Sequence, residues 1–210
     1  MPINRRTICY VLLMSAWLSS CTTTGAVKPC GEDQAQDLCS STMEQISRRI
    51  ERHPDDAAAY LSRGLKYLNE SGDMEAAIAD FTKVLDLKPD CATAYSLRAE
   101  AYIEASDYDH ALADGTKAIE LNPDYGASYY SRADAYRGRG AFDLAIRDYT
   151  RAMELGMAKE WVLVDRGLAY QKLGLMSAAE ADYQAALGGS RAQKARELLG
   201  ALKGAPNSRQ

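Results

Sequence analysis

The sequence is poor in several residue types on which particular functions depend. Its 210 residues include only two histidines, His53 and His110, and neither has an obvious serine or cysteine partner or a cluster of metal ligands near it. The formal net charge of −4 argues against a surface built to bind nucleic-acid phosphates. No glycine-rich phosphate loop occurs. We therefore expect no enzyme activity, no cofactor or metal, no nucleic-acid partner and no small-molecule substrate.

The sequence also lacks an apolar run long enough to cross a membrane. The apolar segment 8–18 has about 11 residues, whereas a spanning helix needs about 20. The segment follows Arg5 and Arg6, and a basic start before a short apolar core is typical of a signal peptide. Residues 1–20 are therefore expected to direct export and to be removed. Their loss takes away two arginines and no acid, so the net charge changes from −4 to −6.

The end of this segment carries a more specific motif. Leu18-Ser19-Ser20-Cys21 resembles the lipobox of bacterial lipoproteins, although an ordinary signal peptide with an accidental cysteine is the alternative. The resemblance implies acylation of Cys21, and buried acyl chains contribute about 0.8 kcal/mol per methylene to anchoring. Thr22 follows, where lipoproteins retained in the inner membrane commonly have Asp. The resemblance thus implies a lipid anchor in the outer membrane, on its periplasmic side.

Residues 21–37 are expected to form a lipidated, flexible tether between the anchor and the folded part. Cys30, Cys39 and Cys91 remain besides Cys21. In an oxidising compartment Cys30 and Cys39 are a candidate disulfide, while free thiols and a link to Cys91 stay open as alternatives.

The sequence is rich in one repeated pattern with a period of about 34 residues. A small residue is followed three positions later by tyrosine, and an alanine is followed four positions later by a mostly aromatic column. Such spacings of three and four indicate apolar stripes on helices. The first repeat has one extra residue, which we place in the turn at 69–72. The four repeats are 57–91, 92–125, 126–159 and 160–194; the small residues are Gly64, Ala99, Ala133 and Gly167; the tyrosines are Tyr67, Tyr102, Tyr136 and Tyr170; and the aromatic column is Phe81, Gly115, Tyr149 and Tyr183.

Together with a closing proline in the first two copies, this pattern resembles the tetratricopeptide repeat over about 57–188. The resemblance implies an all-α, right-handed superhelical solenoid of four helix-turn-helix repeats. Residues 41–53 look like a helix of an incomplete repeat, and a helix with Ser190 as its N-cap looks like a C-terminal cap. The solenoid is therefore expected over 38–204, with ten helices, and residues 205–210 are expected to be disordered.

Each repeat also has an arginine directly before its small residue and an aspartate directly before its aromatic column. The two lie on facing helices of one repeat, so we predict structural ion pairs, within a repeat or with its neighbour. Duplication alone would explain the recurrence without any pairing. The arginines are Arg63, Arg98, Arg132 and Arg166, and the aspartates are Asp80, Asp114, Asp148 and Asp182.

Solenoids of this family bind partners mainly on a concave face lined by the first helix of each repeat. The corresponding residues predict a groove that is apolar at its N-terminal end, acidic in the middle and aromatic towards Trp161. A partner segment with a basic side chain and an apolar anchor would fit it, and a solvated wall without preference is the alternative. By family position the groove residues are Leu61, Leu65, Leu68, Glu100, Ile103, Glu104, Tyr130, Asp134, Arg137, Trp161, Asp165 and Leu168.

These features lead us to expect a lipid-anchored scaffold or adaptor that binds protein or peptide partners in the bacterial cell envelope. The alternative is a pilotin or assembly factor for a pilus or secretion channel, since those proteins share the combination of lipobox and repeats. The Lys and Asn pattern by which related domains hold a C-terminal carboxylate is absent from the groove positions.

Overall fold

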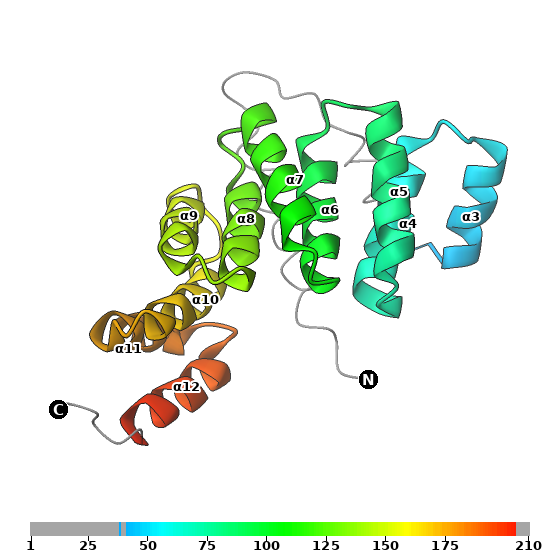
Figure 1. Cartoon of the computed structure of the whole chain (residues 1–210). Coiled ribbons are helices and arrows are strands. Elements are labelled where there is room, and N and C mark those ends of the chain that lie inside the picture. The colour runs from blue at the N-terminus through cyan, green and yellow to red at the C-terminus, as the bar shows by residue number, and fades with distance from the viewer. Residues whose placement is uncertain (1–37, 39–40, 205–210) are drawn as a thin grey trace. The chain divides into compact units, whose positions relative to one another are not determined.

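The computed structural model describes residue 38 and residues 41–204, with side chains described as far as residue 202. All regular elements in this part of the chain are helical (Figure 1), and none of the described helices is long and apolar enough to cross a membrane. The predicted signal peptide, Cys21 and the tether lie outside the described residues. Cys91 takes part in a disulfide, whereas Cys30 and Cys39, whose pairing the sequence leaves open, also lie outside them.

The chain divides into two compact units, at 1–124 and 125–210. Each predicted repeat contains one pair of helices, and an additional helix precedes the first pair and follows the last. The first unit contains α3 (Met43–Arg52), α4 (Ala57–Lys66), η1 (Tyr67–Ser71), α5 (Met74–Leu87), α6 (Ala92–Glu104) and α7 (Tyr108–Leu121). The second contains α8 (Gly126–Gly138), α9 (Phe142–Glu154), α10 (Lys159–Lys172), α11 (Met176–Ala185), η2 (Ala186–Gly188) and α12 (Ala192–Gly204).

In each repeat the turn between the two helices contains one residue with a positive φ angle. Gly72, Gly140 and Gly174 have φ values of 71°, 78° and 75°, a left-handed conformation that a residue without Cβ adopts at no steric cost. Ser106 occupies the same place in the second repeat with φ 62°. The extra residue of the first repeat is absorbed by η1, which is a π-helical turn directly after α4.

The small-residue column exists because an aromatic ring lies against the first helix of the repeat. A Cβ added at Gly64 would lie 2.7 Å from Cε1 of Phe81, and one at Gly167 would lie 2.5 Å from Cε1 of Tyr183. Both distances are shorter than packed carbon atoms tolerate, so these two sites require glycine unless the ring moves. In the first and fourth repeats, the small residue therefore allows the two helices to approach closely.

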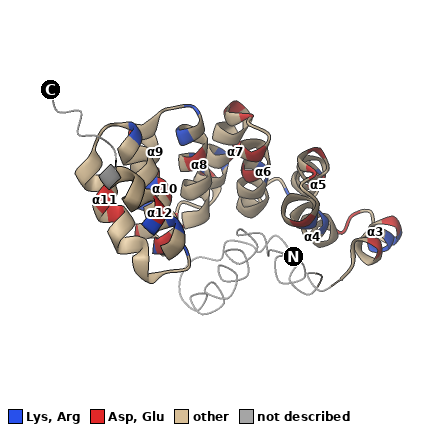
Figure 2. Cartoon of the chain, turned by 90° about the horizontal axis from the view of Figure 1, so that it is seen from below, with Lys and Arg blue, Asp and Glu red and all other residues tan. Residues whose placement is uncertain are grey.

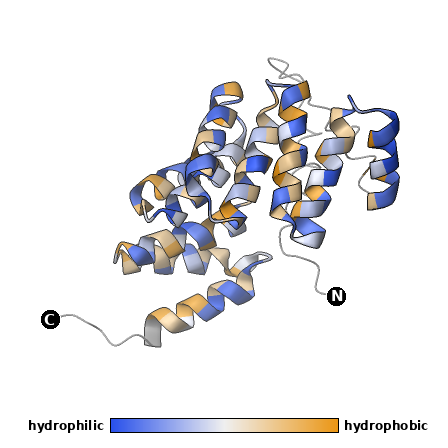
Figure 3. Ribbon diagram, turned by 45° about the vertical axis from the view of Figure 1, so that its right-hand side comes forward, coloured by the Kyte–Doolittle hydropathy of each residue, from blue (hydrophilic) through white to orange (hydrophobic). Residues whose placement is uncertain are grey.

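The C-terminal helix α12 covers the end of the second unit. Ala195 and Leu199 are buried there in one cluster with Val164 and Tyr183. Figure 3 shows that α12, like the other helices, mixes apolar with polar residues along its length. The capping role predicted for this helix is confirmed, but α12 begins at Ala192, so Ser190 lies one residue too early to be its N-cap.

Candidate partner-binding site

All four predicted arginine–aspartate pairs are present, and each forms within its own repeat. The arginine Nε and Nη2 donate to the two carboxylate oxygens at distances of 2.7–3.0 Å. Such a two-pronged contact fixes orientation as well as distance. The hydrogen bonds that each arginine donates to its aspartate raise the pKa of the arginine above its usual range, although burial works in the opposite direction. We call these four pairs the repeat clamps.

The clamps also extend to neighbouring side chains that the sequence pattern does not connect with them. Nη1 of Arg98 donates to Thr82 Oγ1 at 3.0 Å, and Nη1 of Arg166 donates to Thr150 Oγ1 at 2.9 Å, so each arginine reaches the preceding helix as well. The guanidinium of Arg166 lies 5.7 Å from the ring centroid of Tyr170, within the range of a cation–π contact. The clamps therefore have an architectural role, and those of Arg98 and Arg166 join three helices.

The groove residues predicted in the first unit separate into two groups. Leu61, Leu65 and Leu68 lie in the buried core cluster that contains Phe81, with at most 8% of each residue exposed. On α6, in contrast, Glu100 and Ile103 are half-buried and Glu104 is exposed. In this structure the leucines are packing residues of the repeat, and the three α6 residues form the accessible part of the prediction.

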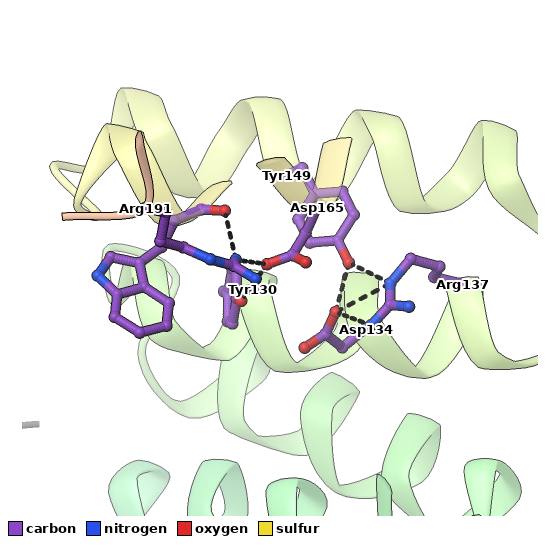
Figure 4. Close-up of polar contacts among 7 residues, drawn as sticks. Tyr130, Asp134, Arg137, Tyr149, Asp165 and Arg191 are labelled. Carbon is purple, nitrogen blue, oxygen red and sulfur yellow. Dashed lines mark hydrogen bonds and ion pairs between the residues drawn. The ribbon is translucent and has the colours of Figure 1, made fainter. Parts of the chain in front are cut away.

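The groove residues predicted in the second unit come together in a hydrogen-bonded network (Figure 4). Asp134 and Arg137 lie one helical turn apart on α8, and Arg137 Nη2 donates to Asp134 Oδ1 at 2.9 Å. Tyr149 on α9 donates its hydroxyl hydrogen to the same carboxylate oxygen and accepts from Arg137 Nε at 3.0 Å. Asp134 and Tyr149 are both buried, so each polar group here is satisfied by another one of the same repeat.

The second half of this network is centred on Asp165 of α10. Its Oδ2 accepts from the Tyr130 hydroxyl of α8 at 2.7 Å and from Arg191 Nη1 at 2.7 Å. The same Nη1 of Arg191 lies 3.2 Å from the carbonyl oxygen of Trp161. The Arg191 guanidinium also lies 4.9 Å from the centroid of a Trp161 ring. We call Tyr130, Asp134, Arg137, Tyr149, Asp165 and Arg191 the inner network.

The electrostatics of the inner network follow from burial. Burial, and next the charge of Asp134, raise the pKa of Asp165, while the cation of Arg191 lowers it. Burial raises the pKa of Tyr130 and of Tyr149 well above the usual range, and the two carboxylates reinforce this effect. The tyrosines therefore remain hydrogen-bond donors near neutral pH. Both acids already accept hydrogen bonds from arginines of their own unit, so a basic side chain of a partner could bind either carboxylate only in place of one of these arginines.

Sequence reasoning identified four members of the network but missed two. In the sequence Tyr149 belongs to the aromatic column, and Arg191 is not among the predicted groove residues. A buried tyrosine hydroxyl requires a hydrogen-bond partner, so a tyrosine instead of a phenylalanine at position 149 indicates a polar group next to the ring. The fourth repeat repeats this relation, because the Tyr183 hydroxyl donates to Gln171 Oε1 at 2.9 Å. Leu168, the last predicted groove residue, is half-buried on α10.

An open cleft of about 790 Å³ lies in the first unit between α3, the start of α4 and the end of α5. Four cations line it, but Arg48 pairs with Glu44 at 2.7 Å and Arg49 pairs with Asp56 at 2.6 Å. Figure 2 shows the acidic and basic residues side by side on α3. Two of the four cations of the cleft are therefore neutralised locally.

Comparison with known proteins agrees with the repeat structure. Models of the tetratricopeptide repeat match residues 44–90, 66–125, 97–158 and 162–188. A thermophilic tetratricopeptide protein from Thermus thermophilus, TTC0263, has a similar structure, with a TM-score of 0.67 and 19% identity over 83% of this chain and 95% of that one. The MamA protein gives a TM-score of 0.60 and 23% identity over 80% of this chain and 90% of that one.

A third similar structure contains a bound peptide. The first tetratricopeptide domain of Spaghetti (RPAP3), bound to the HSP90 peptide SRMEEVD, has a TM-score of 0.53 and 27% identity over 56% of this chain and 93% of that one. A search of curated proteins gives no significant match. Proteins built from these repeats are generally non-enzymatic scaffolds for protein–protein interactions. On the evidence of its family models and its helix pairs, the chain belongs to the tetratricopeptide repeat family and has that family's all-α fold.

Proposed function

We propose that this protein is a lipid-anchored scaffold that binds protein partners in the bacterial cell envelope, through the face of α8 and α10 in its second unit. Family membership supports the binding of protein partners. The basic start, the short apolar core and the lipobox ending at Cys21 support export and acylation. Thr22 after the cysteine supports retention at the outer membrane.

One observation carries the choice of the second unit. At the family's partner-binding positions, α8 and α10 present a charged and aromatic set, whereas the first repeat has buried leucines. The Arg137 side chain is 33% exposed, and Trp161 and Leu168 are half-buried, so a partner can reach these three without displacing a helix. Planar, adaptable groups of this kind dominate the energetics of many protein interfaces.

The partner's chemistry should differ from that of the acidic HSP90 peptide in the RPAP3 complex. This chain lacks the Lys and Asn pattern that holds a C-terminal carboxylate, and its candidate face combines an indole ring, a half-buried leucine and acids. We expect an internal peptide segment that presents an apolar side chain and a basic one.

Crosslinking in intact cells, followed by affinity purification and mass spectrometry, tests the binding function. Wild type should enrich a defined envelope protein over a lipidated control protein. Arg137→Ala should reduce that enrichment several-fold, while the matched control Arg147→Ala, an exposed arginine of α9, should leave it unchanged. Thermal unfolding of both variants shows whether they are folded. If wild type enriches no envelope protein over the lipidated control, the scaffold function is wrong.

The lipid anchor has its own test. In a Gram-negative host supplied with labelled palmitate, wild type should carry the label and sediment with outer membranes. Cys21→Ser should lose the label and appear in the soluble periplasmic fraction, with Cys9→Ser as the matched control. An unlabelled wild type, or a Cys21→Ser variant that stays in the membrane fraction, would contradict the anchor.

A further inference from the structure

The surroundings of Arg191 have the composition of a binding site for a guanidinium group. A buried carboxylate, Asp165, and the backbone carbonyl of Trp161 both accept from Nη1, at 2.7 Å and 3.2 Å. The Trp161 indole lies over the same guanidinium, with the centroid of one ring 4.9 Å from Cζ. Proteins recognise arginine by carboxylates, which accept charge-assisted hydrogen bonds from the guanidinium, and by aromatic rings on which the guanidinium lies. We call these groups the guanidinium subsite.

Arg191 enters this subsite from a turn rather than from a packed helix. It precedes the first residue of α12, Ala192, and follows the glycines at 188 and 189. The helix itself is held by other contacts, since Ala195 and Leu199 are buried in the core cluster. The Arg191 side chain can therefore leave the subsite while α12 remains in place.

The fit of Arg191 in the subsite is incomplete. Its Nε is buried and meets no hydrogen-bond acceptor among the described residues. A buried donor without an acceptor destabilises the arrangement that contains it. The arginine of another chain could make the same contacts through Nη1 and the indole while bringing its own acceptor to Nε. A competing arginine could therefore be accommodated better than Arg191 is.

From these observations we propose that the guanidinium subsite is a recognition site for an arginine side chain of the partner, and that Arg191 occupies it in the absence of the partner. The proposal rests on the proposed scaffold function and names the partner's recognition element. A planar guanidinium can lie flat on the indole while donating to both oxygens, which a compact ammonium cannot do as well, so arginine is preferred to lysine. Asp165 is then balanced by a cation in both the free and the bound state.

A small probe tests the subsite without any partner. The chain contains two tryptophans, Trp17 and Trp161. Trp17 lies in the segment 1–20 that we expect to be removed, so Trp161 is the sole indole reporter of the processed protein, and Trp17→Phe gives the same condition in the unprocessed chain. Titration with N-acetyl-arginine amide should change the fluorescence of Trp161, and N-acetyl-citrulline amide, which is neutral, should not. In the Arg191→Ala background the probe should bind at least about ten-fold more tightly than in the parent. The reason is that the probe can bind only those molecules whose subsite Arg191 has left, and if these are about one in ten, the apparent affinity of the parent is lowered about ten-fold.

Two further variants keep the result interpretable. Lys194→Ala removes a cation from α12 itself, where Lys194 pairs loosely with Glu197 at 3.6 Å, and should bind the probe as the parent does. Adding Asp165→Asn to Arg191→Ala should abolish binding. If Arg191→Ala does not fold, Arg191→Gln replaces it, and the probe should then raise the melting temperature of the variant but not that of the parent.

The proposal is overturned if both Arg191 variants bind the arginine probe within two-fold of the parent, or if citrulline binds equally well. Such an outcome leaves the scaffold function standing, because partner capture in cells is measured separately. Conversely, a chain that captures no envelope protein but binds the probe as expected would have the subsite without the proposed scaffold role. With a captured partner in hand, Arg191→Ala should increase capture, and replacing the partner's arginine should reverse that gain.

Discussion

In the first unit, Phe81 shares its buried cluster with Leu65 and Leu68, whereas the equivalent Tyr149 in the second unit bonds to Asp134 and Arg137. The backbone plan is the same, since both rings project from the second helix of a repeat towards the first. The comparison shows that one repeat shape can be filled either by apolar packing or by a satisfied polar network. The polar solution is the one that leaves charged groups near a surface where a partner could use them.

The two units also differ in how their α-helices begin. In the first unit every described α-helix starts with a side-chain cap that accepts a backbone N–H, and in the second unit none of α8 to α11 has one. A good N-cap contributes about 1 kcal/mol, so the second unit depends more on tertiary contacts. The caps of the first unit are Thr42, Asp56, Asp73, Cys91 and Asp107.

The largest expected effect on stability comes from removing one member of the polar network in the third repeat. Asp134→Ala leaves the cation of Arg137 and the hydroxyl of Tyr149 without their acceptor, and we expect a loss of about 3 kcal/mol in the free energy of unfolding. This value is at the lower end of the range for buried pairs, because a third of the Arg137 side chain is exposed. Urea unfolding followed by circular dichroism measures it.

The control replaces the polar network of the third repeat by the apolar packing of the first repeat. The triple variant Asp134→Leu, Arg137→Leu and Tyr149→Phe copies the residues of the first repeat, and it should unfold within about 1 kcal/mol of wild type or be more stable. A triple variant as unstable as Asp134→Ala would show that the two solutions are not interchangeable.

The clamps, in contrast, should make the two units alike. Double-mutant cycles with Arg98→Ala and Asp114→Ala in the first unit, and with Arg166→Ala and Asp182→Ala in the second, should each give a coupling of about 2 kcal/mol. The reason is that both pairs have the same two-pronged geometry and similar burial. Additive effects of the single changes in either unfolding cycle would contradict the pairing.

Adding an N-cap to the second unit, or removing one from the first, should have smaller effects on stability. Leu175 occupies the N-cap position of α11 with half of its surface exposed, so Leu175→Asp should raise the melting temperature through a gain of about 1 kcal/mol. Asp73→Ala, at the corresponding position of α5, should lose a similar amount. Leu175→Ala is the control and should change little. If Leu175→Asp lowers the melting temperature instead, Leu175 has a packing role that its exposure does not reveal.

The smallest effects concern pH, and they should have opposite signs in the two units. Burial works against the charge of Asp56, but hydrogen bonds from Arg49 and the Ala59 amide outweigh it and lower its pKa. Its contribution to stability is thus present above the ordinary value of 3.8 and is lost as the pH falls through the lower folded value. Burial raises the pKa of Asp165, so its contribution is present below 3.8 and is lost as the pH rises through the higher folded value.

Unfolding free energies from about pH 3 to pH 7 measure this difference. Asp56→Asn should flatten the loss of stability on the acid side, and Asp165→Asn should remove a decrease that wild type shows above 3.8. Identical pH profiles for the two variants would contradict the opposite shifts.

Much of the fold follows from the sequence, because its signals are local and repeated. Spacings of three and four place Tyr67 and Phe81 on helices, and the recurrence of Gly64 and Gly167 marks where rings approach a backbone. The clamps also follow, since Arg63 and Asp80 lie 17 residues apart within one repeat, and the same interval of 16 or 17 recurs in every copy. The same pair of residues at the same spacing therefore occurs four times in the sequence.

The inner network was decided by the tertiary structure. Tyr130 and Asp165 are 35 residues apart, and Arg191 and Asp165 are 26 apart, whereas the clamps recur at 16 or 17 residues in every repeat. Sequence periodicity identifies what every repeat has in common, so it determined the helix pairs, their turns and their clamps. Which polar groups satisfy one another is decided only when different helices bury them together, because a buried charge takes whichever partner the packing brings within hydrogen-bond distance.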